Sequence, residues 1–349
     1  MPASPDAAIL RLLRSAGDTF TPGSELGQPA ALDASIASLT AAGYELEHHP
    51  HLGYRLLSSP GSLIADDILS RLPECQWIRD VVVFRKTAST NDLVAGLARR
   101  GAQPGIAVFA EEQTAGRGRL GRQWQSDPRL GLWFSILLRP ALPLAQWPRL
   151  TLWIAYAIAQ AICRFPFEAP WAAPQIMLKW PNDLYASGRK VAGILVESSL
   201  GESPFAVAGI GINVNHASFP PPLDTTATSL RLSLLELELE LEPKPKLEPA
   251  LEHELELPPE LDRNALAAAI LLSLDQSYSL ISNDFSQMIA WASSSDYLRG
   301  RSISATVGAT IVEGVAQGLD PEGALLIRTH DGGLTTLTSG EVTRFSAAP

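Results

Sequence analysis

The sequence predicts an α+β protein with three domains: a small helical unit ending in a hairpin, a central mixed α/β core, and a short all-β unit. Amphipathic helices and an alternating hairpin occupy the first sixty residues. Apolar strands alternate with helices from residue 79 onward, and short strands with glycine turns fill residues 300–345. A chain of 349 residues suits two or three domains, and we expect them at 1–62, 63–298 and 299–349.

The N-terminal unit has the element order of a winged helix-turn-helix domain. Leucine and isoleucine recur at helical spacing in residues 9–13 and 32–39, and side chains alternate on both sides of a turn at 50–53. The second helix of such a domain contacts DNA through Arg, Lys, Asn or Gln. Residues 29–43 contain none of these four residue types. We therefore expect a residual winged domain that no longer binds DNA.

The central core is predicted from six apolar runs and three helical stretches. The strands are expected at 81–84, 106–110, 132–138, 175–180, 191–197 and 205–214, and the helices at 91–100, 148–164 and 262–298. The most apolar run, Leu150–Cys163, has 14 residues, whereas crossing a bilayer takes roughly 20. It predicts a buried helix, so we expect no membrane association.

An acidic, low-complexity insertion is expected at residues 233–260. Leucine and glutamate alternate over residues 235–241, which is the period of an edge strand. The Pro-Lys-Pro-Lys break at 243–246 and the repeated acidic residues favour a solvated, disordered or loosely ordered loop instead. A segment that binds a partner is the alternative.

Composition excludes several classes of protein. The chain has 27 Lys and Arg against 37 Asp and Glu, a formal net charge of −10, which argues against broad charge-driven binding to nucleic acid. Its two cysteines, Cys75 and Cys163, exclude a disulfide scaffold and a multi-cysteine zinc site. The first residues lack the pattern of an export signal. We therefore expect a cytoplasmic protein.

The first candidate site is the segment Ala115–Trp124, AGRGRLGRQW. Glycines let the backbone approach a ligand, and arginines offer charged, bidentate donors to phosphate or carboxylate. A basic, flexible surface loop is the alternative interpretation.

The second site combines Lys179–Tyr185, KWPNDLY, with Gly188–Ile194, GRKVAGI. Its Pro-Asn-Asp turn lets strands return antiparallel, which predicts that Lys179, Asp183 and Lys190 meet. An ordinary charged hairpin is the alternative there.

A third segment, Gly209–Asn215, GIGINVN, has two glycines at a spacing of two on a strand, which allows another backbone or a flat ligand to lie against it. It is not a dinucleotide fingerprint, because no third glycine follows at the required spacing.

Taken in order, five motifs resemble those of the biotin protein ligases: KTASTND at 86–92, EQTAGRGR at 112–119, KWPNDL at 179–184, GRKVAGILVE at 188–197 and GIGINVN at 209–215. The resemblance is strong over residues 84–215 and weaker in the flanks. It implies a winged-helix N-terminal domain, a class II synthetase-like ligase domain and an SH3-like barrel, as in the bacterial bifunctional type that also represses the biotin operon.

The resemblance implies roles for particular residues. Ser89, Thr90, Asn91 and Gln113 would hydrogen-bond the ureido ring of biotin. Arg117, Gly118 and Arg119 would form a loop that closes over the reaction centre, with Lys190 between the biotin carboxylate and the α-phosphate and with Arg119 and Lys190 as the catalytic pair. The nucleotide side would be lined by Arg122, Lys179, Asn182, Asp183, Gly193 and Asn213.

The implied reaction consumes biotin and ATP with Mg²⁺ and forms biotinyl-5′-AMP. A lysine of a biotin carboxyl carrier domain, as in acetyl-CoA carboxylase, would then receive the biotin. The resemblance also allows a homodimer. Two alternatives remain: acyl transfer of the lipoate ligase type, whose enzymes share the core fold, and a biotin-responsive transcriptional repressor. The GRGRLGR and KWPNDL motifs favour biotin over lipoate, and the missing DNA-contacting side chains argue against the repressor.

Overall fold

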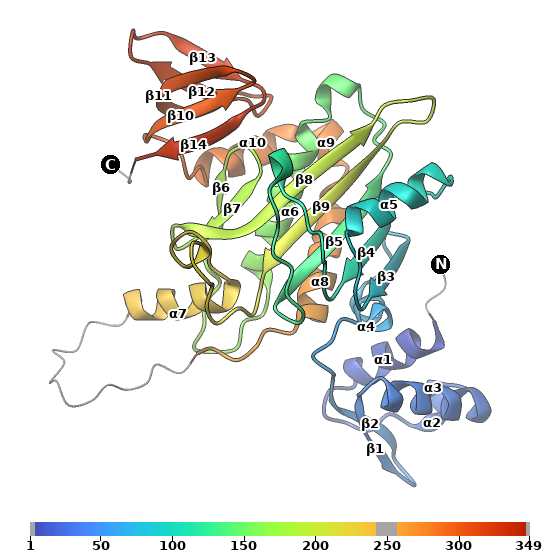
Figure 1. Ribbon diagram of the computed structural model, residues 1–349. Coiled ribbons are helices and arrows are strands. Elements are labelled where there is room, and N and C mark those ends of the chain that lie inside the picture. Colours follow the sequence, from blue (N-terminus) through green and yellow to red (C-terminus); the bar gives the residue numbers. More distant parts are fainter. Residues whose placement is uncertain (1–3, 242–256, 347–349) are drawn as a thin grey trace, which may run out of the picture.

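The computed structural model describes residues 4–241 and 257–346, which form three regions in sequence order (Figure 1). The N-terminal region contains helices α1 (Pro5–Ser15), α2 (Gly23–Leu26) and α3 (Pro29–Ala41) and the hairpin β1 (Glu45–His49) and β2 (Gly53–Ser58). Ser4 caps α1 by accepting the Ala7 N–H at 3.0 Å. Helices followed by an antiparallel hairpin match the expected order.

The central region is built on a seven-stranded sheet in the order β3-β4-β5-β9-β8-β7-β6. Its strands are β3 (Asp80–Phe84), β4 (Ile106–Ala110), β5 (Gly131–Leu138), β6 (Met177–Lys179), β7 (Asp183–Ala186), β8 (Arg189–Ser199) and β9 (Phe205–Asn213). Only β3 and β4 pair in parallel among the described strands. The helices are α4 (Ala65–Arg71), α5 (Thr90–Arg99), α6 (Arg149–Arg164), α7 (Leu230–Leu241), α8 (Arg263–Ser277), α9 (Leu280–Asn283) and α10 (Phe285–Ser294).

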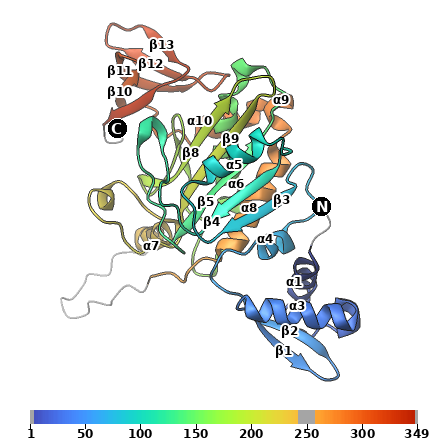
Figure 2. The same ribbon diagram turned by 45° about the vertical axis from the view of Figure 1, so that its right-hand side comes forward.

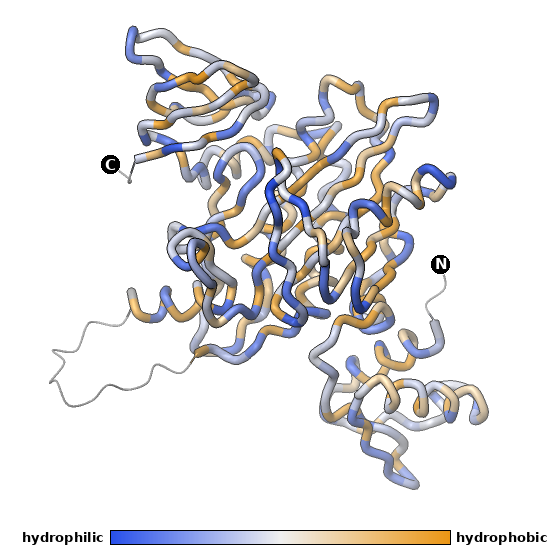
Figure 3. The backbone as a smooth tube through the Cα atoms, in the orientation of Figure 1, coloured by the Kyte–Doolittle hydropathy of each residue, from blue (hydrophilic) through white to orange (hydrophobic). Residues whose placement is uncertain are grey.

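Helices cover both faces of this sheet (Figures 1 and 2). Successive strand residues point to opposite faces, so on β5 Leu137 packs with Val94 of α5, while Ile136 and Leu138 pack with the core that contains α6 and α8. Every residue of β5 is therefore buried. Figure 3 shows the apolar colour concentrated on the central strands and on the helices behind them.

One helical run among the described residues, Arg263–Asn283, is long and apolar enough to cross a membrane by length and composition. Half of that run is buried inside the fold, and α8 packs against α6, where Trp153 Nε1 donates to Ser277 Oγ at 3.0 Å. This run therefore includes a helix of the protein core.

The prediction for residues 235–241 is wrong, because they belong to helix α7 and form neither a strand nor a loose loop. Leu230 and Leu234, four residues apart, are both buried against the core, and Glu236 forms an ion pair with Arg189. Burial at positions 230, 233 and 234, with Leu232 less buried, follows the helical spacing of i, i+3 and i+4 and not an alternation of two. Residues 242–256 of the predicted insertion lie outside the described residues.

The C-terminal region is a five-stranded antiparallel sheet in the order β13-β12-β11-β10-β14. Its strands are β10 (Ser302–Val307), β11 (Thr310–Leu319), β12 (Leu325–Thr329), β13 (Leu334–Leu337) and β14 (Glu341–Phe345). Its small core is continuous with Trp180 and Tyr185 of the central region. This shared core holds β14 beside β6 and β7.

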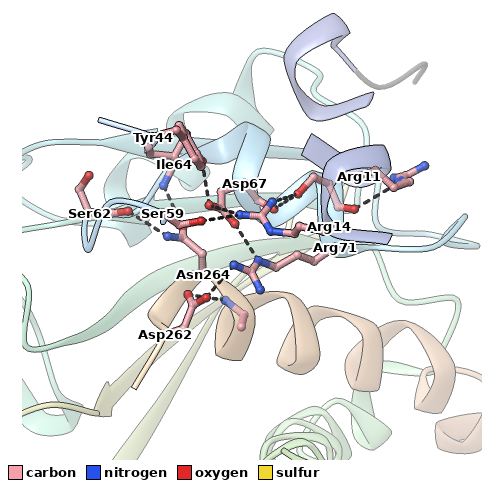
Figure 4. A network of polar contacts seen from close by, with 12 residues as sticks. Arg11, Arg14, Tyr44, Ser59, Ser62, Ile64, Asp67, Arg71, Asp262 and Asn264 are labelled. Carbon is pink, nitrogen blue, oxygen red and sulfur yellow. Dashed lines mark hydrogen bonds and ion pairs between the residues drawn. The ribbon is translucent and has the colours of Figure 1, made fainter. Parts of the chain in front are cut away.

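A buried carboxylate joins the N-terminal region to the central one (Figure 4). Asp67 of α4 is fully buried and accepts hydrogen bonds from Arg14 at 2.8 Å, Tyr44 at 2.7 Å and Arg71 at 2.7 Å. Burial, followed by the Asp67 charge, raises the pKa of Tyr44 far above its usual value, so the phenol stays a donor. A charged group buried in this way requires all of its partners.

Candidate active site

One pocket of about 340 Å³ lies over strands β8 and β9, and it is bounded by residues 113–125, the β6–β7 turn and the start of β14. All the residues expected to bind substrate line this pocket: Ser89, Thr90, Asn91, Gln113, Arg117, Gly118, Arg119, Arg122, Lys179, Asn182, Asp183, Lys190, Gly193 and Asn213. The pocket therefore unites segments up to 253 positions apart in the sequence, from Ser89 to Val342.

One end of the pocket is polar and uncharged. Ser89 and Thr90 lie at the N-terminus of α5 and are almost fully buried. The Thr90 N–H donates to Gln113 Oε1 at 2.8 Å, and Gln113 Nε2 donates to Ser126 Oγ at 3.0 Å. Short hydroxyl and amide side chains held in this way suit a neutral ligand group with both donors and acceptors.

At this end of the pocket, both polar atoms of the Asn91 side chain form hydrogen bonds with other side chains of the protein. Its Oδ1 accepts from Ser135 at 2.6 Å, and its Nδ2 donates to Glu197 at 2.6 Å. A Cβ at Gly209 would lie 2.2 Å from Asn91 Oδ1, so the first glycine of GIGINVN makes room for this amide. Neither Ser135 nor Glu197 was predicted as a site residue, although Glu197 ends the motif GRKVAGILVE.

The indole ring of Trp124 lies against Gly193 and Gly211, which together form a glycine platform on the sheet. Gly193 and Gly211 are directly paired on β8 and β9, and a Cβ at either would lie within 2.8 Å of the Trp124 ring. The spacing predicted another backbone or a flat ligand against GIGINVN, whereas the structure places a side chain of the protein itself there. Lys190 Nζ lies 5.2 Å from the Trp124 ring centroid, a distance at which a cation is attracted to the ring face.

The other end of the pocket is cationic. Lys190 Nζ lies 2.7 Å from Asp183 Oδ1, and Lys179 Nζ lies between the rings of Tyr185, at 5.7 Å, and Phe345, at 5.1 Å. Burial lowers the pKa of Lys179, against the raising effect of Asp183. As predicted, Lys179, Asp183 and Lys190 come together, but β7 separates the two lysine-bearing strands, so the arrangement has three strands rather than two.

The arginines of the glycine-rich segment point to different ends of the pocket. Arg117 forms a bidentate pair with Asp92, at 2.8 and 2.7 Å, beside the polar end. Arg119 donates to Asn182 Oδ1 at 3.1 Å and to the Gly340 carbonyl at 2.9 Å, and Arg122 pairs with Glu341. The loop that carries them thus contacts the C-terminal region, which the sequence did not indicate.

Asn213 and a second aromatic group complete the pocket wall. Asn213 Nδ2 donates to the Thr228 carbonyl at 3.0 Å and so holds the following loop. The His216 ring stacks on Phe219, with centroids 4.7 Å apart, and its buried Nδ1 makes no hydrogen bond to any described residue. Burial lowers the pKa of His216 to about 4, which keeps the ring neutral at pH 7.

The described residues hold no group of three His, Cys, Asp or Glu side chains that could form a metal site. Among the described residues that line the cationic end, Asp183 and Glu341 are the carboxylates, and Asn182 adds an amide oxygen beside Asp183. One or two carboxylates together with substrate phosphates are the usual ligands of Mg²⁺. These donors fit an ion that arrives with a nucleotide.

Two family models match this chain: the biotin/lipoate A/B protein ligase family over residues 83–215, and the biotin protein ligase C-terminal domain over residues 299–343. The chain is 32% identical to the bifunctional ligase/repressor BirA of Bacillus spizizenii over 93% of this chain and 94% of that protein. It is 31% identical to the biotin--[acetyl-CoA-carboxylase] ligase of Mycobacterium tuberculosis, over 75% of this chain and 87% of the relative.

A solved structure agrees with these matches. The biotin protein ligase from Aquifex aeolicus in complex with biotin and ATP is 26% identical, with a TM-score of 0.59, and the similarity covers 77% of this chain and all of that one. The similarity to the Bacillus relative extends over nearly the whole of both chains and includes the N-terminal region. From these matches and the pocket described above, the chain belongs to the biotin protein ligase family.

Proposed function

We propose that this protein activates biotin with Mg-ATP and transfers it to a lysine of a biotin carboxyl carrier domain, such as that of acetyl-CoA carboxylase. The observation that carries the proposal is the polarity of one pocket. A neutral hydroxyl and amide end and a cationic end lie in a single cavity, with Trp124 on the glycine platform. A substrate with a polar ring and a carboxylate fits this arrangement.

The polar end would hold the biotin head group. Ser89, Thr90 and Gln113 provide hydroxyl and amide groups that can exchange hydrogen bonds with the N–H and C=O groups of a ureido ring. The Aquifex relative is a complex with biotin and ATP. Its similarity supports the same pair of substrates here.

The cationic end would support adenylation. An oxygen of the biotin carboxylate attacks the α-phosphorus of ATP, a new O–P bond forms, and the bond to the β-phosphate oxygen breaks as pyrophosphate leaves. Lys190 and Arg119 offset the repulsion between the two anions, and fixed charges of this kind stabilise the developing negative charge. Arg122 and Lys179 would contact the phosphates, and the Mg²⁺ that enters with ATP would meet Asp183 and Asn182.

The second step needs no nucleophile from this chain. The neutral amine of the carrier lysine attacks the carbonyl of the acyl-adenylate, an amide bond forms, AMP leaves, and the amine loses a proton. The Arg117–Arg122 loop must exclude water from the anhydride until the carrier arrives. Arg119 and Arg122 connect this loop to Asn182 on one side of the pocket and to Gly340 and Glu341 on the other.

Repression is not part of the proposal, although several relatives are named ligase/repressor. The exposed side chains of α3 include Ala34, Ala37 and Ser38 together with the acidic Asp33. Such a surface offers no cation to release counterions from DNA phosphates. We therefore propose a cytoplasmic ligase whose N-terminal region binds no DNA operator.

The deciding experiment incubates the full chain with biotin, Mg-ATP and an isolated carrier domain and measures the intact mass of the carrier. We expect one biotinyl group per carrier domain, dependent on ATP. A carrier whose mass shifts with lipoate and ATP but not with biotin would refute the proposal in favour of the lipoate ligase alternative.

A further inference from the structure

Four side chains form a continuous hydrogen-bond chain behind the polar end of the pocket: Thr90, Ser135, Asn91 and Glu197. The Thr90 and Ser135 hydroxyl oxygens lie 2.6 Å apart, and the Ser135–Asn91 and Asn91–Glu197 contacts are also 2.6 Å long. Ser135 is fully buried in β5, and Thr90 and Asn91 are 3% and 6% exposed. Buried groups this close together have fixed donors and acceptors.

The direction of this hydrogen-bond chain follows from counting protons, starting at Glu197. A carboxylate only accepts, and Glu197 also lies 3.4 Å from the Arg117 guanidinium. The Asn91 amide must therefore turn its NH₂ group toward Glu197 and its oxygen toward Ser135. An amide oxygen also only accepts, so Ser135 donates its single proton to Asn91.

Thr90 must then donate to Ser135. With the Ser135 proton engaged, a contact of 2.6 Å between the two hydroxyls is a hydrogen bond only if Thr90 supplies the proton. Thr90 Oγ1 also lies 3.1 Å from Gln113 Oε1, an oxygen that can accept a second hydrogen bond beside the Thr90 N–H at 2.8 Å. The 2.6 Å contact with Ser135 is the shorter of the two, and in either case the single Thr90 proton points to a protein oxygen rather than into the pocket. The Thr90 hydroxyl oxygen consequently presents only lone pairs to the pocket.

We infer that Ser135, Asn91 and Glu197 make Thr90 a fixed acceptor, so that this end of the pocket selects head groups that bring an N–H. This rests on the proposed function. The ureido ring of biotin has N–H groups, whereas the dithiolane ring of lipoate has none and would leave a buried acceptor unpaired. Sites built to hydrogen-bond one group reject analogues that lack it. Ser135 and Asn91 are therefore positioning residues that act through Thr90.

The test uses cyclic carbamate analogues of biotin, in which a ring oxygen replaces one N–H, with one isomer for each N–H. Adenylate formation is measured with biotin and with both isomers. For the unmodified protein we expect kcat/KM to fall on the order of 10²–10⁴-fold for the isomer that places oxygen opposite Thr90. In Ser135→Ala the Thr90 hydroxyl can turn and donate to the ring oxygen, so this preference should shrink about tenfold or more.

Two further variants make the result decisive. Ser277→Ala removes another buried serine hydroxyl of the same region, on α8, and should keep the full preference. Asn91→Ala frees the Ser135 proton and should reproduce the loss if Ser135→Ala does not fold. An undiminished preference in folded Ser135→Ala or Asn91→Ala, with biotin still used, overturns the inference. An unmodified chain that adenylates no biotin refutes the proposed function instead.

Discussion

Lys190 and Asp183 form an ion pair across neighbouring strands, with 2.7 Å between Nζ and Oδ1, in the wall of the substrate pocket. The lysine is therefore oriented by a carboxylate before any substrate anion approaches. The same carboxylate is a candidate oxygen donor for the magnesium ion of ATP. Binding of Mg-ATP would draw Asp183 toward the ion and leave the Lys190 charge available to the reacting carboxylate and phosphate.

Lys190→Gln should impair adenylation far more than it impairs affinity for a preformed adenylate analogue. The change keeps much of the side-chain length and removes the charge. Loss of one such electrostatic contact costs on the order of 10²–10³ in rate. Lys179→Gln, at the partly buried lysine that we propose for the nucleotide side, is the matched comparison and should lose less. Single-turnover adenylate formation and calorimetric biotin binding measure both effects, and equal losses in the two variants would contradict the assignment.

Arg119→Gly should allow adenylate synthesis but release the intermediate. The arginine connects the loop to Asn182 and to the Gly340 carbonyl, and glycine makes neither contact. Labelling of bystander lysines on an added non-carrier protein should rise, measured by streptavidin blotting. Arg100→Gly, at the exposed C-terminal cap of α5, is the control. Selectivity equal to that of the control would show that this loop does not retain the adenylate.

Glu341→Gln should lower the KM for ATP with little change in kcat. Glu341 pairs with Arg122, whose side chain is 63% exposed, and so competes with a phosphate for that guanidinium. An exposed pair is worth about 0.2–1 kcal/mol, which corresponds to a decrease in KM of at most about fivefold. Initial rates over a range of ATP concentrations measure it. A raised KM would mean that Glu341 positions Arg122 for the nucleotide.

His216 should make the protein less stable as the pH falls from about 6.5 to 4. Burial lowers the pKa of the folded ring to about 4, from 6.5 in an unfolded chain. The unfolded state therefore binds the proton first, and stability present above pH 6.5 is lost on acidification, by at most about 3 kcal/mol. His216→Met should have a flatter profile of Tm against pH over this interval. Parallel Tm profiles for the unmodified protein and His216→Met would show that His216 does not contribute to the loss of stability at low pH.

The N-terminal region should give no specific operator complex at physiological salt. With no Arg, Lys, Asn or Gln between Pro29 and Gly43, α3 can make few of the phosphate and base contacts that hold a recognition helix in the major groove. A gel shift with nanomolar protein, biotin and ATP tests this. A shift specific for one palindromic site would overturn the prediction.

Sequence alone predicted the three-region α+β fold, because strand and helix periodicity in the central core agrees with the tertiary burial of those elements. It also predicted residues that share one pocket, since each lies in a short motif with glycine or a turn residue beside it. Ser135, Glu197, His216 and Glu341 were missed, and Trp124, which ends the first candidate segment, was given no role. Ser135 looks like a strand residue, and Glu341 reaches the pocket only because β14 packs beside β6 and β7. Such contacts depend on sheet order, which local patterns do not contain.

The buried Asp67 carboxylate has a consequence for how this chain can be shortened or can evolve. Two of its three side-chain donors, Arg14 and Tyr44, come from the N-terminal region, and the third comes from its own helix. Cutting the chain after residue 62 would remove both of these donors, and with them the Arg11 hydrogen bonds to the last carbonyls of α4, so that Arg71 alone would remain to pair with Asp67 at the first helix of the ligase core. A lineage that gave up its operator would therefore still keep this region, because selection on the enzyme's stability would preserve it without any DNA to bind.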